Sequence, residues 1–303
     1  MVVHKNLKAI KQYWFLYLLI APVLVYYIAL RFYPMVIQGL LSFKNYQLLG
    51  GVWGSPWVGF DNFVYLFSRP DFANALFNTV EISLLRLFFG FWPPLVLAIL
   101  LFDLRSGLLR RISQTIVYIP HFLSIVIVYG LVFAFFSHSG LVNQLMMRLG
   151  GTEINFLLGE KWFRPLLIGS AIWKEAGWGT IIYLAGLSAI NPALYESAMI
   201  DGAGPWQRNW YITLPLLLPL IIFLFTLSLG SVLYAGGEQI LLFYGPSTYS
   251  VGDVIDTWIY RQGLLQLKYS LAGSAQLFQS LFGLLLVLLA NKLSKKYAGT
   301  GIW

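Results

Sequence analysis

Long apolar blocks dominate the pattern of hydrophobic and polar positions along this chain. Several of them exceed the roughly 20 residues that a helix needs to cross about 30 Å of hydrocarbon. They lack the alternation of apolar and polar residues that marks barrel strands, and helices are the other structure that satisfies its own backbone in a bilayer. The pattern predicts an all-α membrane protein whose six transmembrane helices run at about 13–42, 74–102, 112–137, 165–190, 212–236 and 271–293.

The first apolar block carries two prolines, Pro22 and Pro34, which predict a kink or break near its outer end. Lysines precede the block, at Lys5, Lys8 and Lys11, as in the first part of a signal peptide. No small-residue cleavage site follows a short apolar core, so we expect the block to be retained as a span.

Basic residues in the short segments between spans predict the orientation, because cytoplasmic segments carry an excess of Lys and Arg. Three segments carry them: the N-terminus with Lys5, Lys8 and Lys11, the loop at 103–111 with Arg105, Arg110 and Arg111, and the C-terminal tail with Lys292, Lys295 and Lys296. Six spans place all three groups on the same side of the membrane. Both termini are therefore predicted to be cytoplasmic.

The three outer segments, about 43–73, 138–164 and 237–270, are longer and nearly balanced in charge. They hold Trp53, Trp57, Trp162 and Trp258, for most of which we expect an interfacial belt, with an outer docking surface as the alternative. No internal repeat is visible. The chain is predicted to be a single transmembrane domain over 1–303, too small to enclose a wide pathway alone, which indicates pairing with a second subunit.

Composition narrows the possible chemistry. Hydrophobic residues make up 58% of the chain and charged residues only 11%, too little polar surface for a soluble protein. Without cysteine, the chain has no disulfide, thiolate metal site or cysteine nucleophile. His4, His121 and His138 are scattered, so we predict no metal site and no catalytic residue. The net charge of +8 lies beside the spans and does not indicate a nucleic-acid partner.

The segment between the fourth and fifth spans is more structured than a simple connector requires. Asn191 is a favourable N-cap, and Pro192 suits the first helical position. A short helix is predicted to about Asp201, ended by Gly202, which tolerates positive φ. A second helix starts at Pro205 or Trp206 and leads into the fifth span. This predicts helix, glycine turn and helix in a cytoplasmic loop at about 191–211.

The first of these short helices suits a protein partner. Leu194 and Ala198 share a face and Ser197 is also small, which lets a helix enter a tight cleft, and Glu196 is a single acid beside that face. A helix lying among lipid headgroups would instead carry Lys and Arg on its polar face. This helix has neither, and it carries Glu196 and Asp201.

The same stretch resembles the EAA loop of binding-protein-dependent ABC importer permeases, whose pattern is Glu-Ala-Ala, three residues, Gly, and later Ile-x-Leu-Pro. Here the sequence is Glu196-Ser197-Ala198, then Asp201-Gly202-Ala203, then ITLP at 212–215. Ser197 replaces an alanine, which keeps a small residue at that position.

The resemblance covers nearly the whole chain. VGFDNF at 58–63 and Asn78-Thr79 resemble the start of the core spans in sugar-type permeases of the maltose kind. Further motifs resemble the branch for substrates derived from polysaccharides: WKE at 173–175, GWGTIIYLA at 177–185, YGPSTY at 244–249, DVIDT at 253–257 and the ending GIW at 301–303.

This resemblance implies a type I ABC importer permease in a bacterial cytoplasmic (inner) membrane. Its partners would be membrane lipid, a second, different but homologous permease, two ATP-binding cassette subunits and an extracytoplasmic sugar-binding protein. The loop would dock in a cleft of the ATPase subunit, with coupling residues Glu196, Ser197, Ala198, Asp201, Gly202 and Ala203. Glu196 would pair with a basic group there, and Gly202 would form the bend.

The chain has no G-x-x-x-x-G-K-[ST] phosphate loop, so we expect no enzyme activity or cofactor of its own. ATP and Mg would bind to the partner ATPase subunits. ATP-driven closure of those subunits would move the loop and rock the spans, so that the substrate site opens to each side in turn.

Polar and aromatic residues inside the spans are the candidates for the sugar path. They are Glu238, Gln239, Gln276, Gln279, Trp178 and Tyr183, with Trp173 and Tyr234 as further stacking residues. The alternatives are interhelical hydrogen bonds for the polar groups and packing for the rings. For Glu81, Arg86, Lys174 and Glu175 we expect ion pairs or interfacial positions.

Other functions fit less well. A lipid-headgroup transferase would place further aspartates after Asp201-Gly202, and none follows on that helix. A secondary transporter would need coupling-ion carboxylates and usually a repeat; Glu81 and Glu175 are the available acids. An importer permease for another solute, such as a monosaccharide or glycerol phosphate, stays open as an alternative.

Overall fold

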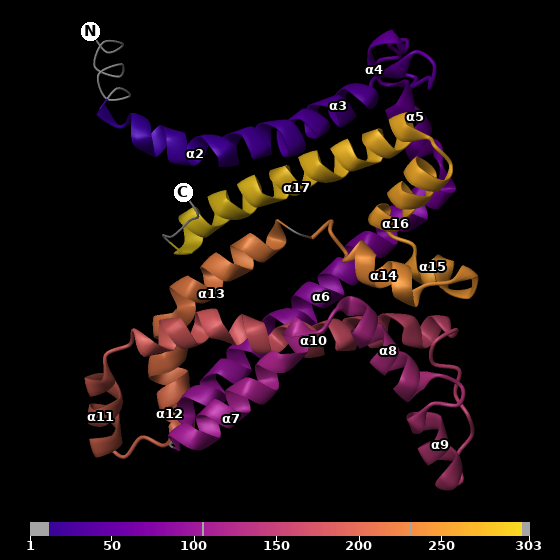
Figure 1. Cartoon of the computed structure of the whole chain (residues 1–303). Helices are drawn as coiled ribbons and strands as arrows, with labels where there is room; N and C mark the ends of the chain where they lie inside the picture. The colour runs from indigo at the N-terminus through magenta and orange to yellow at the C-terminus, as the bar shows by residue number, and fades with distance from the viewer. Residues whose placement is uncertain (1–11, 105, 231, 299–303) are drawn as a thin grey trace. The chain divides into compact units, whose positions relative to one another are not determined.

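The computed structural model describes residues 12–104, 106–230 and 232–298, and these residues fold into helices joined by loops (Figure 1). Lys5, Lys8, Lys11, Arg105 and the GIW ending lie outside the described residues. Two isolated bridge pairs, Lys44 with Trp57 and Gln47 with Gly51, are the extended pairings in these ranges. The all-α prediction is confirmed.

The helices divide between two compact units. The first holds residues 12–68 and 259–277, and the second holds 69–258 and 278–298. In chain order the helices are α2 (Trp14–Tyr27), α3 (Tyr33–Leu41), α4 (Gly51–Gly54), α5 (Asp61–Ser68), α6 (Pro70–Asp103), α7 (Gly107–Tyr118), α8 (Ile125–Phe136), α9 (Leu141–Arg148), α10 (Glu160–Ser188), α11 (Pro192–Ile200), α12 (Pro205–Arg208), α13 (Leu214–Leu229), α14 (Gly237–Phe243), α15 (Tyr249–Gly252), α16 (Ile255–Ile259) and α17 (Tyr269–Ala298).

In the described ranges, five helical stretches are long and apolar enough to cross a membrane. They are Trp14–Leu41, Pro70–Asp103, Ile125–Arg148, Pro205–Leu229 and Tyr269–Lys292. The predicted span at 165–190 coincides with α10, a continuous helix of 29 residues that is less apolar because it carries Arg164, Lys174 and Glu175. The count of six spans and the cytoplasmic termini stay predictions.

Prolines explain the irregular turns of two spans. The first span is continuous, but its helix widens into a π turn at Ile28–Phe32, just before Pro34. A second π turn, Asn209–Thr213, comes just before Pro215. A proline ring clashes with the carbonyl four residues earlier, and a wider turn relieves that clash. The kink predicted for the first span therefore takes the form of a π turn.

The predicted span at 112–137 is broken. Its helix α7 ends in a 3₁₀ turn at Ile119–Phe122, and α8 starts again after Ser124. The hydroxyl of Ser124 accepts a hydrogen bond from the Ile127 N–H (3.3 Å), so this break carries a helix cap of its own.

In the first unit, α3 and the start of α17 are joined by polar contacts. Ser274 Oγ donates to the Ser42 carbonyl (3.2 Å), and Ser270 Oγ accepts from the Tyr46 N–H (2.9 Å). Asn62 Nδ2 also donates to the Ser42 carbonyl (2.9 Å), which ties the VGFDNF motif to the end of α3. None of the residues of α2 is buried within the chain, which suits a helix that faces lipid or a partner.

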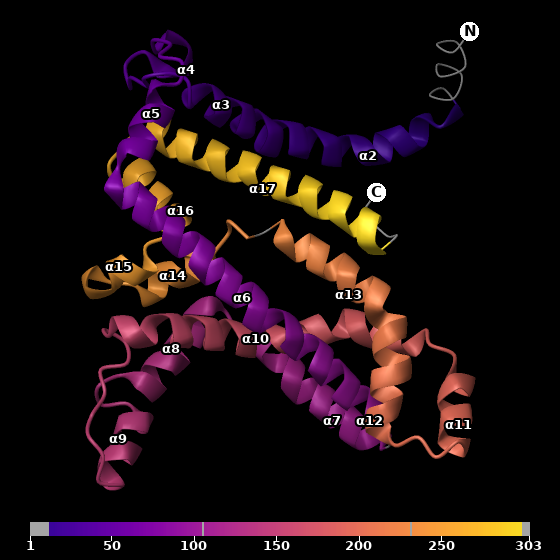
Figure 2. The ribbon, with the colours of Figure 1, turned by 180° about the vertical axis from the view of Figure 1, so that it is seen from behind.

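The second unit is organised around the pairing of α6 with α10, which cross in both views (Figures 1 and 2). Gly177 allows the backbone of α10 to approach α7 closely, since a Cβ there would lie only 1.8 Å from the Val117 carbonyl oxygen. Small residues commonly serve this purpose between membrane helices. A cluster of buried apolar side chains joins α6, α10 and α13: Leu95, Ala98, Tyr183, Leu187 and Leu217.

The structure corrects the interfacial-belt interpretation for Trp258. Its side chain is completely buried, its ring packs against Phe72 (5.1 Å between centroids), and its Nε1 donates to Asp71 Oδ2 (3.0 Å). Trp258 is therefore a core residue of the second unit. Trp53 and Trp57 are exposed, as the belt interpretation requires.

Candidate functional site

The loop at 191–211 folds locally as predicted. Asn191 Oδ1 accepts a hydrogen bond from the Ala193 N–H (3.0 Å), and Pro192 stands at the first helical position of α11. Asparagine satisfies a free N–H at a helix start, and proline has no N–H to satisfy. Both views place α11 at the edge of the second unit (Figures 1 and 2).

Gly202 ends α11 in a Schellman turn. The Ala203 N–H donates to the Ala198 carbonyl (2.8 Å), and the Gly202 N–H donates to the Met199 carbonyl (3.1 Å). Gly202 has φ of 82°, and a Cβ added there would meet no atom within 4 Å. The turn therefore requires glycine for its backbone conformation, and close packing plays no part.

The second short helix is continuous with the fifth span. Gln207 Oε1 accepts from the Gly204 N–H (2.8 Å) at the start of α12. The helix passes through the π turn Asn209–Thr213 into α13, so Pro205–Leu229 forms one helical stretch. A movement of α12 would consequently be carried directly into the membrane.

The predicted coupling residues lie on different sides of this loop. Glu196 and Ser197 are exposed, and Glu196 has no hydrogen bond or ion pair within the residues that the structure describes. Ala198 is half-buried, as is Tyr195, so these two residues face the rest of the chain. Asp201 is exposed and caps the helix, and Ala203 supplies the N–H that closes the turn. Their role in coupling stays a prediction.

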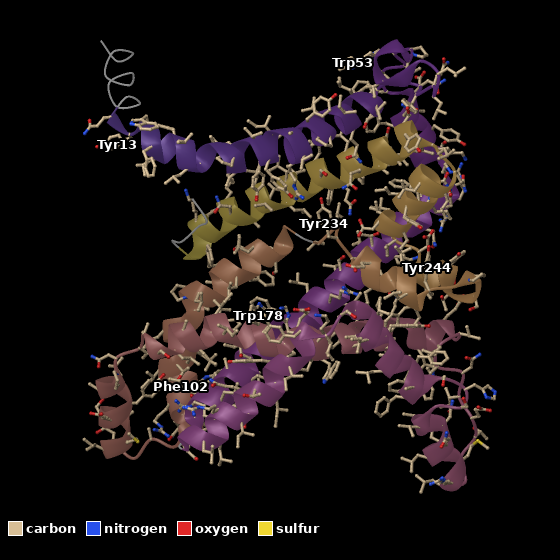
Figure 3. All side chains as sticks on the ribbon, viewed as in Figure 1. Tyr13, Trp53, Phe102, Trp178, Tyr234 and Tyr244 are labelled. Carbon is tan, nitrogen blue, oxygen red and sulfur yellow. The ribbon has the colours of Figure 1, made fainter. Side chains whose placement is uncertain are left out.

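A chain of polar contacts joins α11 to two longer helices. The Tyr195 hydroxyl hydrogen-bonds with Thr213 Oγ1 (2.9 Å), and Thr213 Oγ1 donates to Asn209 Oδ1 (3.1 Å). Asn209 Nδ2 donates to Asp103 Oδ2 at the end of α6 (2.8 Å). The Tyr195 ring also lies 6.2 Å from the ring of Phe102, which Figure 3 labels.

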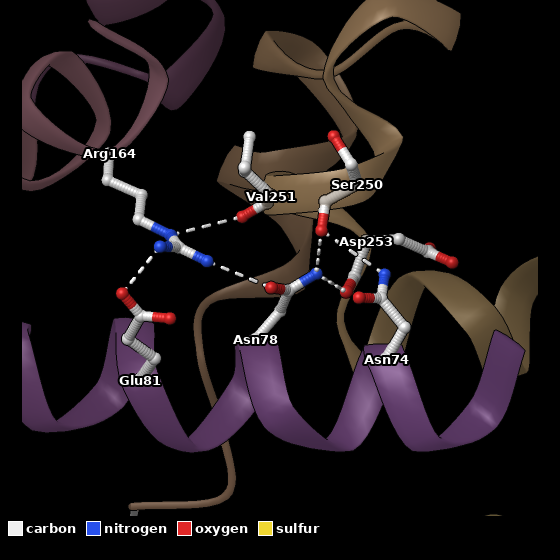
Figure 4. Close-up of polar contacts among 7 residues, drawn as sticks. All are labelled: Asn74, Asn78, Glu81, Arg164, Ser250, Val251 and Asp253. Atoms are coloured by element: carbon white, nitrogen blue, oxygen red, sulfur yellow. Dashed lines mark hydrogen bonds and ion pairs between the residues drawn. The ribbon is translucent and has the colours of Figure 1, made fainter. Parts of the chain in front are cut away.

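A second polar cluster holds the segment at 250–253 against α6 and α10 (Figure 4). Arg164 Nη1 pairs with Glu81 Oε1 (2.5 Å), and Arg164 Nη2 donates to Asn78 Oδ1 (2.9 Å). Asn78 Nδ2 donates to the carbonyls of Ser250 and Asp253 (3.0 Å each). The ion pair expected for Glu81 is confirmed, with Arg164 as its partner.

The neighbouring motif residues serve the same purpose. Thr79 Oγ1 accepts from the Ile255 N–H (2.8 Å), and Thr257 Oγ1 donates to Asp253 Oδ1 (2.8 Å). The Asn78-Thr79 and DVIDT motifs therefore meet, and they fix the segment at 250–257 on α6 through buried hydrogen bonds.

Two of the predicted path residues are engaged in buried structural contacts. Gln239 Nε2 donates to the Leu167 carbonyl (3.1 Å) and Ser170 Oγ (2.9 Å). Gln279 Nε2 donates to the Leu233 carbonyl (2.5 Å) and Asp256 Oδ1 (2.9 Å). These contacts match the interhelical alternative named for the polar groups.

The other path candidates have different surroundings. Glu238 is exposed on α14, and Gln276 is half-buried in the first unit. Trp178, labelled in Figure 3, stacks one face of its ring on His121 at 4.4 Å between centroids. Tyr183 is buried but lines a cavity of the second unit. Their contact with substrate stays a prediction.

The ion pair expected for Lys174 and Glu175 is confirmed, since Lys174 Nζ lies 3.1 Å from Glu175 Oε1. His121 Nδ1 also lies 2.8 Å from Glu175 Oε2. For Arg86 the expectation is an ion pair or an interfacial position. In the described ranges it has no ion pair, and its Nη2 donates to Gln239 Oε1 (2.6 Å), so the interfacial position stays a prediction.

Sequence reasoning missed Arg164, Tyr195 and Asn209 as members of these clusters. Arg164 had a detectable signal, because it directly precedes the predicted span at 165–190 and ionisable residues at membrane spans indicate function or pairing. Tyr195 and Asn209 had none, because their contacts bring together residues that only the folded loop makes neighbours.

Comparison with known proteins agrees with this geometry. The family model described as "binding-protein-dependent transport system inner membrane component" matches residues 90–295. Protein LplB of Bacillus subtilis (strain 168) is 42% identical over 296 residues, covering 97% of this chain and 93% of that protein. The polygalacturonan/rhamnogalacturonan transport system permease protein YteP of the same organism is also 42% identical, covering 96% and 91%.

A solved structure is similarly close. A chain of the bacterial alginate ABC transporter, solved in complex with an alginate pentasaccharide-bound periplasmic protein, superposes with a TM-score of 0.89. It is 43% identical, and the match covers 97% of this chain and 99% of that chain. The sequence motifs, the helical fold and these matches agree, and the chain belongs to the family of inner membrane components of binding-protein-dependent transport systems.

Proposed function

We propose that this chain is one permease subunit of an ATP-driven importer that carries oligosaccharides derived from polysaccharide. The observation that carries the proposal is the likeness, over nearly the whole chain, to the alginate transporter chain. That transporter was solved with a periplasmic protein holding an alginate pentasaccharide, and YteP is named for polygalacturonan and rhamnogalacturonan transport. Alginate is an acidic polysaccharide.

The chain forms half of the translocation path, and a second homologous permease forms the other half. Two ATP-binding cassette subunits bind ATP and Mg and carry out the hydrolysis. An extracytoplasmic solute-binding protein delivers the cargo. Support for this assembly comes from the family, whose description requires a binding protein, and from the absence of a phosphate loop in this sequence.

The loop at 191–211 couples the permease to the ATPase. Glu196 stands exposed on α11, which suits a pair with a basic group in the ATPase cleft. The continuous helix Pro205–Leu229 transmits the movement of the docked loop to the fifth span. The chain thus contributes no catalytic group to ATP hydrolysis.

Reconstitution with the neighbouring permease, ATPase and binding protein tests the proposal. We expect ATP hydrolysis to rise with one or more polysaccharide-derived oligosaccharides, and only when the binding protein is present. Stimulation by a monosaccharide or glycerol phosphate alone would replace the cargo assignment. A complex that never assembles with an ATPase subunit would refute the coupling role.

A charge variant separates coupling from cargo. Glu196→Ala should reduce the amount of ATPase subunit that copurifies with the permeases, because an exposed ionic contact is removed from the docking helix. Asp61→Asn is the matched control, since it removes an exposed acid outside the loop. Equal copurification of both variants with the ATPase would contradict the role of Glu196.

A further inference from the structure

A cavity of about 410 Å³ lies in the second unit between α6, α10, α13 and the segment that follows α13. This volume is within the range of small-molecule sites. Its wall is mostly apolar, and the polar groups that line it include Ser83, Arg86, Glu175, Tyr183 and Tyr234. Figure 3 labels Tyr234 on the segment after α13.

Arg86 brings an uncompensated positive charge to this cavity. Among the residues that the structure describes, its guanidinium has no carboxylate partner, and its buried Nε has no hydrogen-bond partner. Its Nη2 donates to Gln239 Oε1 (2.6 Å), and Gln239 is itself held by Ser170 Oγ (2.9 Å). A neutral amide therefore positions the guanidinium without neutralising it, whereas Arg164 in the same unit pairs with Glu81.

Ser83 adds a second unsatisfied group to the same wall. It precedes Arg86 by three residues on α6, which places both side chains on one face of the helix. Within the described part of the chain, the buried Ser83 Oγ has no hydrogen-bond partner. Buried polar groups without partners are costly and uncommon in proteins. Two such groups side by side, both lining a cavity, indicate a ligand that accepts hydrogen bonds.

The acidic residue of the cavity does not compete for Arg86. Glu175 also lines the wall, but its carboxylate is engaged by His121 Nδ1 (2.8 Å) and Lys174 Nζ (3.1 Å). The positive charge of Arg86 therefore has no counter-charge in the cavity among the described residues, and a negatively charged ligand would supply one. A carboxylate can supply this counter-charge, because a guanidinium binds carboxylates through strong charge-assisted hydrogen bonds.

We propose that Arg86 and Ser83 bind a carboxylate of the cargo during its passage, so that the cavity selects oligosaccharides containing uronic acids. This inference rests on the proposed function and names the substrate class more closely. Arg86 donates to the carboxylate, Ser83 donates from its hydroxyl, and Tyr183 and Tyr234 offer rings against which a sugar can lie. A carboxylate side chain of the second permease is the other possible source of the same chemistry.

The test measures uptake into liposomes that contain the complete importer, with the binding protein outside and ATP inside. The probes are an alginate pentasaccharide and the same pentasaccharide with its carboxylates methyl-esterified. The variants are Arg86→Gln, Arg86→Lys and Ser83→Ala. Arg148→Gln is the control, because it removes an equal charge from an exposed position on α9. For each probe, uptake by the variant is divided by uptake by the wild type with the same binding protein. The preference of the binding protein for one probe therefore cancels in the ratio.

We expect Arg86→Gln to lower kcat/KM for the acidic probe roughly tenfold or more, the loss typical of a charge-assisted hydrogen bond, and to spare the ester. Arg86→Lys should recover part of the uptake and Ser83→Ala should lose less than Arg86→Gln, while Arg148→Gln should match wild type. The binding protein can prove to deliver only the acidic probe, so that the ester gives no signal. In that case the recovery of acidic uptake in Arg86→Lys, relative to Arg86→Gln, tests whether the positive charge is needed.

Three results would overturn the inference. If Arg86→Gln takes up the acidic probe as fast as the wild type does, the proposed carboxylate site is refuted and the importer function stands. Equal loss for acid and ester, together with loss of the second permease from the purified complex, assigns the counter-charge to that subunit. Failure of wild type to import the acidic probe removes the cargo class itself.

Discussion

The hydroxyl of Tyr195 on α11 hydrogen-bonds with Thr213 Oγ1 at 2.9 Å, where the π turn passes into α13. Thr213 in turn contacts Asn209, whose amide reaches Asp103 at the end of α6. One short chain of polar groups thus ties the exposed helix of the loop to the bases of two membrane-spanning helices. A displacement of α11 by a docked partner would therefore move the start of α13 and the end of α6.

Removing the middle of this chain should weaken coupling. In Thr213→Val the Tyr195 hydroxyl and Asn209 Oδ1 lose their shared partner, at a cost of about 1 kcal/mol or more. We expect the oligosaccharide imported per ATP hydrolysed to fall several-fold, roughly in line with that energy. Ser188→Ala is the control, because among the described residues the one hydrogen bond of Ser188 Oγ goes to the Leu184 carbonyl of its own helix (2.8 Å). A Thr213→Val importer with the wild-type ratio would show that the chain carries no coupling.

The conformation of Gly202 predicts a graded series of variants. With φ of 82°, this position tolerates Asn better than Ala, which loses about 1–2 kcal/mol in a left-handed conformation. Proline cannot reach that φ at all, and it would remove the N–H that bonds to Met199. Copurification of the ATPase subunit should fall in the order Gly, Asn, Ala, Pro.

Gly107→Ala provides the matched control for this series. Gly107 starts α7, its φ lies outside the positive range, and a Cβ there meets no atom within 4 Å. It should retain normal ATPase binding. An unordered series at Gly202, or equal binding by all variants, would contradict the need for a positive φ.

The cluster in Figure 4 makes Asn78 a stability residue. Asn78→Ala would leave the carbonyls of Ser250 and Asp253 and one Arg164 N–H without their buried partner. We expect the free energy of unfolding to fall by about 1–3 kcal/mol, measured by thermal unfolding in detergent. Asn74→Ala removes a single exposed bond to Ser250 (3.2 Å) and should change it by no more than about 0.5 kcal/mol. Similar effects of the two variants would refute the buried clamp.

The absence of native cysteine makes topology directly measurable. A single cysteine introduced at exposed Ile200 should be labelled by a membrane-impermeant maleimide only after the membrane is opened. The positive-inside distribution predicts this result, since the loop and the basic segments fall on one side. A cysteine at exposed Leu49 should react from outside in intact cells. Labelling of position 200 from outside would invert the orientation.

The loop at 191–211 could be predicted residue by residue because capping is a local property. Asn191, Pro192 and Gly202 each act on backbone groups a few residues away, and the sequence pattern is enough to place them. The apolar blocks likewise predicted the spanning helices, although the break after Phe122 shows that an apolar run does not by itself require an unbroken helix.

The partners of the polar residues could not be predicted in the same way. Arg86 and Arg164 both stand next to apolar residues in the sequence, and only the folded chain shows that Arg164 meets Glu81 while Arg86 meets a neutral amide. Trp258 had the residue type and the sequence position expected of a belt residue, and it is instead buried against Phe72. Contacts between residues far apart in the chain decide these cases.

The most direct measurement is uptake of a labelled oligosaccharide into liposomes that hold this chain with its second permease and ATPase subunits. We expect accumulation that needs ATP inside and the loaded binding protein outside, and that disappears when either is omitted. Accumulation driven by an ion gradient without ATP, or independent of the binding protein, would contradict the assignment as an importer permease.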